Sequence, residues 1–247
     1  MYKQTKVFAN GLALLFIISF CSIQAMGQWR AISGSGNVVS ETRTITGFDQ
    51  ITVGGAFDLF ITIGDGWHIE VVADDNLMER IQIETIGKTL RIGMTPSTNL
   101  RRYKELKVHV TMPAIRELKT SGASTAVFTN AVRQPMLVLS SSGASDIRLS
   151  VEVDELYVNS SGSSDVHISG FAAFAEVSAS GSSDFRGQNF ECAVASVRLS
   201  GSSDMWATIT QRVTGSLSGS SDLRIVGGSP VVDVRTSGSS GVRQSGR

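Results

Sequence analysis

The sequence predicts an all-β fold, a right-handed parallel β-helix (β-solenoid) with coils of about 19 residues. A Ser-Gly-Ser-Ser-Asp motif recurs at nearly constant spacing through the second half of the chain. Such a period, varying by one or two residues, is typical of a solenoid. Within each copy, apolar and small residues alternate with polar ones, which is the period of a β-strand. The chain also has 25 glycines and only 4 prolines, which suits many strands joined by tight bends.

The first element is a targeting segment, which we predict to be a signal peptide over residues 1–27. Two lysines precede the apolar run Gly11–Phe20, and Ala25–Gly27 offers small residues for a cleavage site. The run is shorter than the roughly 20 residues of a spanning helix, which disfavours an uncleaved anchor. Lipidation of Cys21 is disfavoured because Phe20 stands where a small residue is expected. We therefore expect an exported protein, in the periplasm, on the outer cell surface or outside the cell.

Residues 28–247 are predicted to form a single β-solenoid domain, whose first coils, over residues 30–118, are irregular. This part lacks the Ser-Gly-Ser-Ser-Asp copies, but short alternating runs follow one another, separated by glycine-containing turns. The one helical candidate is ADDNLMERI, residues 73–81, which Asp74 or Asp75 can cap. We expect this helix to cover the open end of the solenoid, where strand edges would otherwise be exposed.

The repeat coils span residues 119–243, and each contains one Ser-Gly corner. We predict that the glycine points inward at a tight bend, where a Cβ atom would collide with the closing backbone. The serine two residues later has the same parity, so its hydroxyl should bond inside to other hydroxyls or to corner carbonyls. The predicted structural glycines are Gly122, Gly143, Gly162, Gly181, Gly201, Gly219 and Gly238. The predicted inward serines are Ser124, Ser145, Ser164, Ser183, Ser203, Ser221 and Ser240.

The aspartate that closes most copies has the opposite parity and should form a column on the surface. Bare carboxylates one coil apart, at about 4.8 Å, repel by about 1 kcal/mol in water and by several times that near a protein surface. Three arrangements can relieve this repulsion: bend capping with pairing to nearby arginines, which we favour, a bound cation such as calcium, or solvation alone. The predicted surface column is Asp146, Asp165, Asp184, Asp204 and Asp222.

Composition and motifs argue against nucleic-acid binding and against catalysis. Lys plus Arg equals Asp plus Glu at 22 each, so the chain lacks the basic surplus of a nucleic-acid binder. His68, His109 and His167 show no metal-ligand spacing, and no serine stands in a nucleophile elbow. An active site needs a unique place, whereas the aspartates repeat regularly. We therefore predict no catalytic residue, metal or cofactor, and we expect Cys192 to be a small buried side chain.

Three elements in a fixed order carry a resemblance to a known family. They are SGSGNVVSETRTITGFDQITVGGAFDLFITIGDG, then VVADDNLMERIQIETIGKTLRI, then the serial SGSSD coils. Over roughly residues 34–240, the chain resembles the bacterial family of auto-transporter adhesin head (GIN) domains, a domain of unknown function. The resemblance implies an exported β-helical protein of the cell envelope, and it carries over no catalytic or binding residue.

The favoured function is therefore that of a non-catalytic envelope or cell-surface solenoid that binds a glycan or a protein partner. Two alternatives stay open. One is a polysaccharide-acting lyase or hydrolase, because parallel β-helices can hold clustered carboxylates in a groove. The other is a purely structural component of the envelope. A groove lined with aromatic residues would favour a glycan, but Trp206 is the only tryptophan in the repeats.

Overall fold

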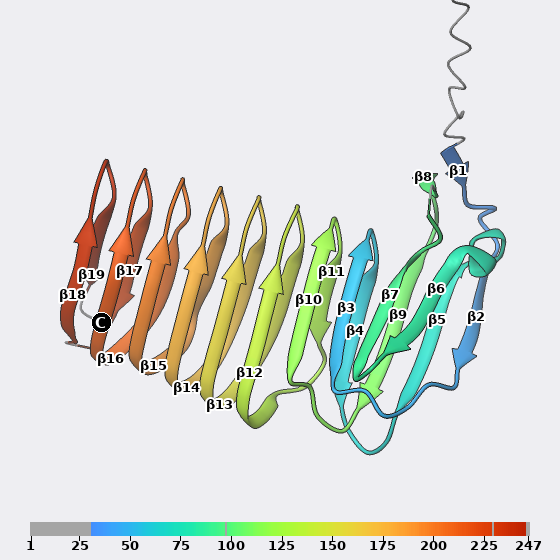
Figure 1. Ribbon diagram of the computed structural model, residues 1–247, viewed down its shortest axis with the longest axis horizontal. Helices are drawn as coiled ribbons and strands as arrows, with labels where there is room; N and C mark the ends of the chain where they lie inside the picture. The colour runs from blue at the N-terminus through green and yellow to red at the C-terminus, as the bar shows by residue number, and fades with distance from the viewer. Residues whose placement is uncertain (1–30, 97, 229, 246–247) are drawn as a thin grey trace, which may run out of the picture.

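The protein is described by a computed structural model over residues 31–96, 98–228 and 230–245. The predicted signal peptide, residues 1–27, lies outside these described residues. The chain forms a flattened β-solenoid in which two long sheets face each other and the coils stack along one axis (Figure 1). The predicted fold class is confirmed. None of the helical segments in the described part has the length and apolar character needed to cross a bilayer.

The strands are short at the amino-terminal end and long in the middle of the repeats. The first nine are β1 (Ala31–Ser33), β2 (Val38–Arg43), β3 (Gln50–Gly55), β4 (Asp58–Ile63), β5 (His68–Asp74), β6 (Ile81–Ile86), β7 (Thr89–Met94), β8 (Asn99–Arg102) and β9 (Leu106–Met112). A 3-10 helix, η1 (Asp75–Arg80), joins β5 to β6. The others are β10 (Glu117–Gly122), β11 (Thr125–Phe128), β12 (Val132–Ser141), β13 (Asp146–Ser160), β14 (Asp165–Ala179), β15 (Asp184–Leu199), β16 (Met205–Leu217), β17 (Asp222–Val226), β18 (Val231–Thr236) and β19 (Gly241–Ser245).

The long strands β13 to β16 bend from one sheet into the other. Their carboxy-terminal halves join β7, β3, β10, β12 and β18 in sheet 1, and their amino-terminal halves join β9, β4, β11, β17 and β19 in sheet 2. The pairing is parallel throughout the repeats. Asp146 lies beside Asp165, and Leu156 beside Ala175. Equivalent residues of successive coils therefore stack in columns.

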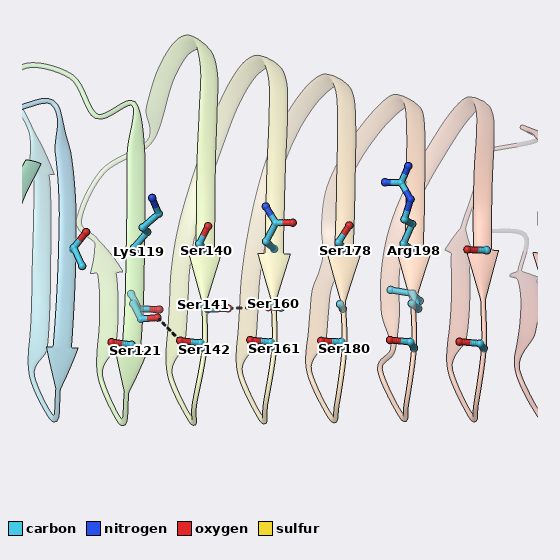
Figure 2. A pocket seen from close by; sticks show the side chains of 18 residues that line it. Lys119, Ser121, Ser140, Ser141, Ser142, Ser160, Ser161, Ser178, Ser180 and Arg198 are labelled. Atoms are coloured by element: carbon cyan, nitrogen blue, oxygen red, sulfur yellow. Dashed lines mark hydrogen bonds between the residues drawn. The ribbon is translucent and has the colours of Figure 1, made fainter. Parts of the chain in front are cut away.

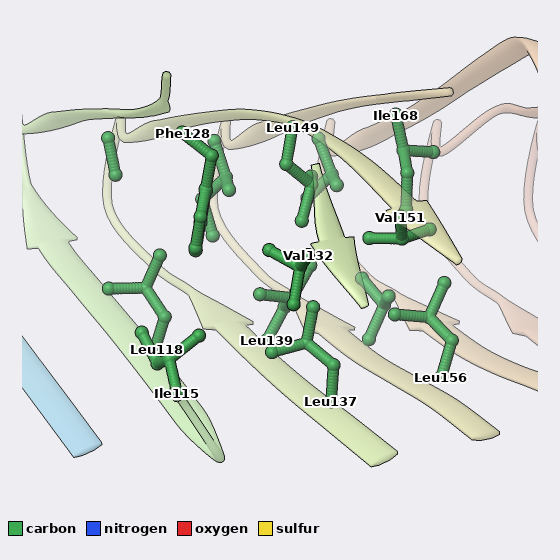
Figure 3. Packing of buried hydrophobic residues seen from close by; sticks show 14 of the residues in the cluster. Ile115, Leu118, Phe128, Val132, Leu137, Leu139, Leu149, Val151, Leu156 and Ile168 are labelled. Carbon is green, nitrogen blue, oxygen red and sulfur yellow. The ribbon is translucent and has the colours of Figure 1, made fainter. Parts of the chain in front are cut away.

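The core runs between the two sheets along the whole stack. Inward side chains alternate with outward ones, as the period of two predicts. Figure 3 shows Leu139 and Leu156 on one side of this core, facing Leu149 and Ile168 on the other. Each such side chain contributes about 1.5–3 kcal/mol to folding when it is fully buried. The coils are held together by this continuous core and by the parallel ladders.

The amino-terminal coils do not stack in the order of the sequence. Strand β3 pairs in parallel with β7 on one side and with β10 on the other, and β4 lies likewise between β9 and β11. The corner of this inserted coil is Gly54-Gly55-Ala56-Phe57, and Gly55 lies beside Gly122, the first repeat glycine. TVGGAFD is therefore a degenerate copy of the repeat, in which Phe57 fills the inward position that serine occupies elsewhere.

The amino-terminal end is closed by antiparallel strands and by η1. Strand β2 pairs with β5, β5 with β9, and β6 with β7. The predicted helix is confirmed as a 3-10 helix that buries Leu77 and Met78. The predicted cap is wrong, because the N-cap residue Asp74 makes no side-chain capping bond. Asp74 is fully buried, and its carboxylate instead accepts bonds from the Gly36 and Lys104 N–H groups, at 2.7 Å each.

Candidate functional site

The repeat glycines lie at the exposed tips of the corners, so the expected inward position is wrong. They are required for another reason. Gly162 has a φ of +80°, and a Cβ added there would lie 2.5 Å from the Gly143 carbonyl oxygen of the preceding coil. Gly181 has the same φ and the same clearance from the Gly162 oxygen. A left-handed backbone and a close coil-to-coil approach both exclude other residues.

The serines two residues after each glycine form a buried column inside the corner. Ser164 donates its hydroxyl to the Ser161 carbonyl at 2.9 Å, and Ser183 does the same to Ser180 at 3.0 Å. The hydroxyl thus bridges its own corner, satisfying a carbonyl that the tight turn leaves without a ladder partner. Six of the seven predicted serines are fully buried, and Ser240, in the last coil, is partly exposed.

The aspartate column lies half-buried beside the corner on sheet 2. The Arg186 guanidinium lies between two members of the column, 2.9 Å from the Asp165 carboxylate and 3.1 Å from that of Asp184. The Asp184 carboxylate also accepts the Asp204 N–H at 3.2 Å, and that of Asp204 accepts the Asp222 N–H at 3.0 Å. Each of these two carboxylates therefore caps the backbone of the next coil.

The side chains in the column next to the aspartates, two residues further along each strand, are cationic or aromatic. Arg224 lies over the Trp206 ring, with its guanidinium carbon 5.1 Å from the ring centroid. Burial, together with the nearby Arg148 and Arg186, lowers the pKa of His167. Among the described residues, no three His, Cys, Asp or Glu side chains are grouped so as to hold a metal ion. The predicted surface residues thus form a network of alternating charges rather than a pocket.

Sequence reasoning missed a groove on the opposite side of the corner, on sheet 1. The groove has a volume of about 690 Å³ and runs across the coils (Figure 2). We name it the serine groove. It is lined by Thr52, Lys119, Thr120, Ser121, Ser140, Ser141, Ser142, Asn159, Ser160, Ser161, Ser178, Ala179, Ser180, Arg198, Leu199, Ser200, Ser216 and Ser218.

Three columns build the serine groove. One wall is formed by the residues just before the glycines, such as Ser161 and Ser180, and the other by outward strand residues, such as Ser140 and Ser178. The floor is a column of small or apolar inward residues, within which the Ser141 and Ser160 hydroxyls bond each other at 2.8 Å. Most side chains in the three columns are small, which leaves the hollow, and Lys119 and Arg198 are the long exceptions in the outward column. The first serine of each motif is the sequence signal that could have revealed the groove, because it recurs in the repeats although the bend does not require a serine there.

The two basic residues of the serine groove are already paired. The Arg198 guanidinium lies 2.7 Å from the Glu176 carboxylate, and the Lys119 ammonium lies 2.9 Å from that of Glu117. Of the described residues that line the groove, none is Asp, Glu or His. The groove is therefore close to neutral and rich in hydroxyl groups, which suits an uncharged polar ligand.

An aromatic pair lies on the same face of sheet 1. Tyr157 precedes the groove residue Asn159 by two positions, so that both side chains point outward from β13. Its ring packs edge-on against Phe174 of the next coil, at 6.1 Å between centroids. The Tyr157 hydroxyl donates to the Glu155 carboxylate at 2.8 Å, and this bond raises the pKa of the tyrosine. On the coil before Tyr157, Met136 lies beside Glu155 and is exposed.

The remaining reactive side chains are scattered or buried. Cys192 is a free cysteine that is fully buried, as predicted, and burial raises the pKa of its thiol to about 12. His68 is exposed on β5, and the His109 ring of β9 stacks on Phe60 at 4.9 Å between centroids. With His167 on β14, the three histidines lie on three different strands.

Comparisons with known proteins agree with this architecture. The family described as "Putative auto-transporter adhesin, head GIN domain" matches residues 47–229. No curated protein matches the chain. A "putative adhesin" from Bacteroides fragilis NCTC 9343 has a similar structure, with a TM-score of 0.80 and 20% identity over 87% of this chain and 100% of that one.

Two further structures show the same fold. A "putative adhesin" from Parabacteroides merdae ATCC 43184 gives a TM-score of 0.68 at 17% identity, over 87% of this chain and 99% of that one. A "Putative lipid binding protein" from Parabacteroides distasonis ATCC 8503 gives 0.73 at 19% identity, over 87% of this chain and 100% of that one. At these identities the likeness shows the fold alone.

Proposed function

The chain belongs to the auto-transporter adhesin head GIN domain family, and from this premise we propose that it is an exported, non-catalytic adhesin that binds a glycan in the serine groove. The observation that carries the proposal is the groove itself. It is neutral and lined with hydroxyl and amide groups, and an aromatic pair lies beside it. The proposal includes export directed by residues 1–27, whose removal would leave residues 28–247 as one solenoid domain.

Sugar chains present hydroxyl groups at regular intervals along an extended backbone. The serine groove presents hydroxyl donors and acceptors once per coil, over a length of roughly 29 Å at about 4.8 Å per coil. The flat apolar faces of sugar rings pack on aromatic rings, and Tyr157 and Phe174 are placed to receive them. A binding site of this kind uses a few polar groups to fix orientation beside an apolar surface.

Catalysis on the same polysaccharide is less well supported. A lyase or hydrolase needs carboxylates in the groove, and none lines the serine groove among the described residues. The aspartate column lies on sheet 2, and its members are engaged by guanidinium groups and backbone N–H groups. A purely structural role does not account for the serine groove, whereas glycan binding does.

Binding is tested by screening the purified protein against glycans, matrix proteins and phospholipid vesicles. The decisive variant is Ser161→Phe, which would fill the groove at a half-exposed position. We expect it to weaken glycan binding by about tenfold or more, equivalent to ~1.4 kcal/mol. The matched control is Ser163→Phe, two residues away on the exposed far side of the same corner, which should bind as the wild type does. Binding only to proteins or vesicles would overturn the proposal.

Export is tested by amino-terminal sequencing of the native protein. We expect the chain to begin near Gln28 and to be found outside the cytoplasm. An intact Met1, or a lipid attached to Cys21, would contradict the predicted cleavage.

A further inference from the structure

The carboxy-terminal end of the solenoid is an open edge. Strand β18 pairs only with β16, and β19 only with β17, so no described strand covers the outer side of either one. Val232 lies at an inward position, in register with the fully buried Val213, yet it is 42% exposed. The neighbouring inward residues Val234 and Val242 are only partly buried. Within the described residues, both the apolar core and the backbone ladder are therefore open at this end.

The direction of the free backbone groups follows from the last ladder bonds. The Ser237 N–H donates to the Leu217 carbonyl of β16, and the Gly241 N–H donates to the Ser221 carbonyl next to β17. Successive residues of a strand direct their N–H and C=O groups to opposite sides. The groups of Val234, in β18, and of Val242, in β19, therefore point toward the open edge.

The sequence of β18, VVDVRT, is self-complementary when it is laid antiparallel to a second copy of itself about Val234. In that register the two Val234 residues exchange both backbone hydrogen bonds. Asp233 then faces Arg235 of the other copy, in the closely spaced non-hydrogen-bonded pair of an antiparallel ladder. The pairing occurs twice by symmetry, so it places two ion pairs across one short edge. We propose that this edge binds a second copy of the chain, end to end.

The second strand of the edge fits the same symmetry. Val234 and Val242 lie four residues before and after the corner glycine Gly238, so they are opposite each other across the core. One two-fold axis, normal to the sheets, can pass through both. It pairs β18 with β18 and β19 with β19, which continues each sheet into the other copy. It also places Val234 and Val242 against their counterparts and Val232 against Thr236 of the other copy, so all three valines are buried in an isologous interface.

The pairing makes a rod of two solenoids with their amino-terminal ends outermost. Because sheet 1 continues into sheet 1, the two serine grooves lie on the same face of the rod. A ligand long enough to reach both would bind with the gain in avidity that two linked sites provide. The end-to-end contact itself does not depend on what the groove binds.

The contact is tested by exchanging the two charges. Asp233→Arg or Arg235→Asp alone places like charges opposite each other across the interface, so each should weaken association by about tenfold or more. The double variant carrying both changes restores opposite charges and should dimerise as the wild type does. Sedimentation velocity over a concentration series measures the three variants beside the wild type. Misfolding cannot imitate this pattern, because the double variant carries both changes.

Two further variants locate the contact. Val234→Pro removes the N–H group at the two-fold axis while leaving the β16 ladder intact, and it should yield a monomer with an unchanged circular dichroism spectrum. Glu84→Arg, on the exposed edge strand β6 at the other end, should leave association unchanged. A wild type that stays monomeric at every concentration, a double variant that does not recover, or loss of the dimer in Glu84→Arg would each overturn the proposal.

Discussion

At the amino-terminal end of the solenoid, η1 and the β6–β7 hairpin close the core over Leu77 and Met78. At the carboxy-terminal end, by contrast, Val232 occupies an inward position and is still 42% exposed. The closed end is where the sequence departs from the repeat: the strands turn antiparallel and one coil is inserted out of order. The open end keeps the repeat through the last coil that the structure describes. An end of a solenoid is therefore closed by a segment that departs from the repeat sequence, because each regular coil has a free strand edge to which another coil can pair.

The largest expected effect is a difference in stability between substitutions at the two ends. Leu77→Ala removes a fully buried side chain from the closed end and should destabilise the protein by about 2–5 kcal/mol. Val232→Ala, at the open end, should cost a monomer about 0.5 kcal/mol or less, because much of its surface is already in water. Urea unfolding of both variants, at concentrations where the chain is monomeric, measures the difference. Equal losses would mean that η1 is not a cap.

The same contrast explains which parts of the fold could be predicted. The regular coils were predictable because a period of about 19 residues and an alternation of two fix which residues stack and which face inward. The inserted coil was not predictable, because Gly55 lies next to Gly122 although 67 positions separate them in the sequence. Its corner also lacks the expected serine, since Phe57 fills the core there. Long-range pairing of a degenerate copy leaves no local signal.

The candidate site likewise has features that the sequence could predict and features that it could not. The parity of the motif placed Ser164 inside and Asp165 outside, and the structure agrees with both placements. Parity could not predict the position of Gly162, because this residue has a left-handed backbone conformation that breaks the strand alternation. The glycine therefore lies at the exposed tip of the corner. The serine groove was missed since it depends on three neighbouring columns at once. Ser161 is unremarkable alone, and the hollow arises only when small residues stack over many coils.

The second prediction compares a corner of the repeats with a turn in the amino-terminal part. Gly181 and Gly66 have nearly the same φ, +80° and +79°, but a Cβ at Gly181 would lie 2.5 Å from a neighbouring carbonyl oxygen, whereas at Gly66 nothing lies within 4 Å. Gly66→Ala should therefore cost only the backbone strain of about 1–2 kcal/mol. Gly181→Ala should cost a further 1–3 kcal/mol or so from overpacking. Similar melting temperatures would show that stacking does not constrain the corner.

The third prediction compares the aspartate column with its counterpart in the inserted coil. Asp184→Ala removes one of the two carboxylate partners of Arg186 and the acceptor for the Asp204 N–H, and it should cost about 1 kcal/mol. Asp184→Asn should cost less, because the amide oxygen can still accept that N–H. Asp58, in the inserted coil, is exposed, so Asp58→Ala should change stability by less than about 0.5 kcal/mol. Thermal unfolding of the three variants ranks them, and a reversed order would remove the capping role.

The smallest expected effect is that of calcium, for which we predict no change in melting temperature. The relief of repulsion that a cation would bring is already provided by Arg186, which lies between Asp165 and Asp184. A cation would have to displace that guanidinium. The net stabilisation would then be only the difference between the attraction of the carboxylates to the cation and their attraction to the guanidinium. If the column did bind calcium, mass action would stabilise the fold by about 2.7 kcal/mol at a hundred times the dissociation constant. A chelator would then lower the melting temperature of the wild type, and Asp184→Asn would abolish the effect. Such a shift would place the aspartate column, rather than the serine groove, at the centre of the function, and would reopen the lyase alternative.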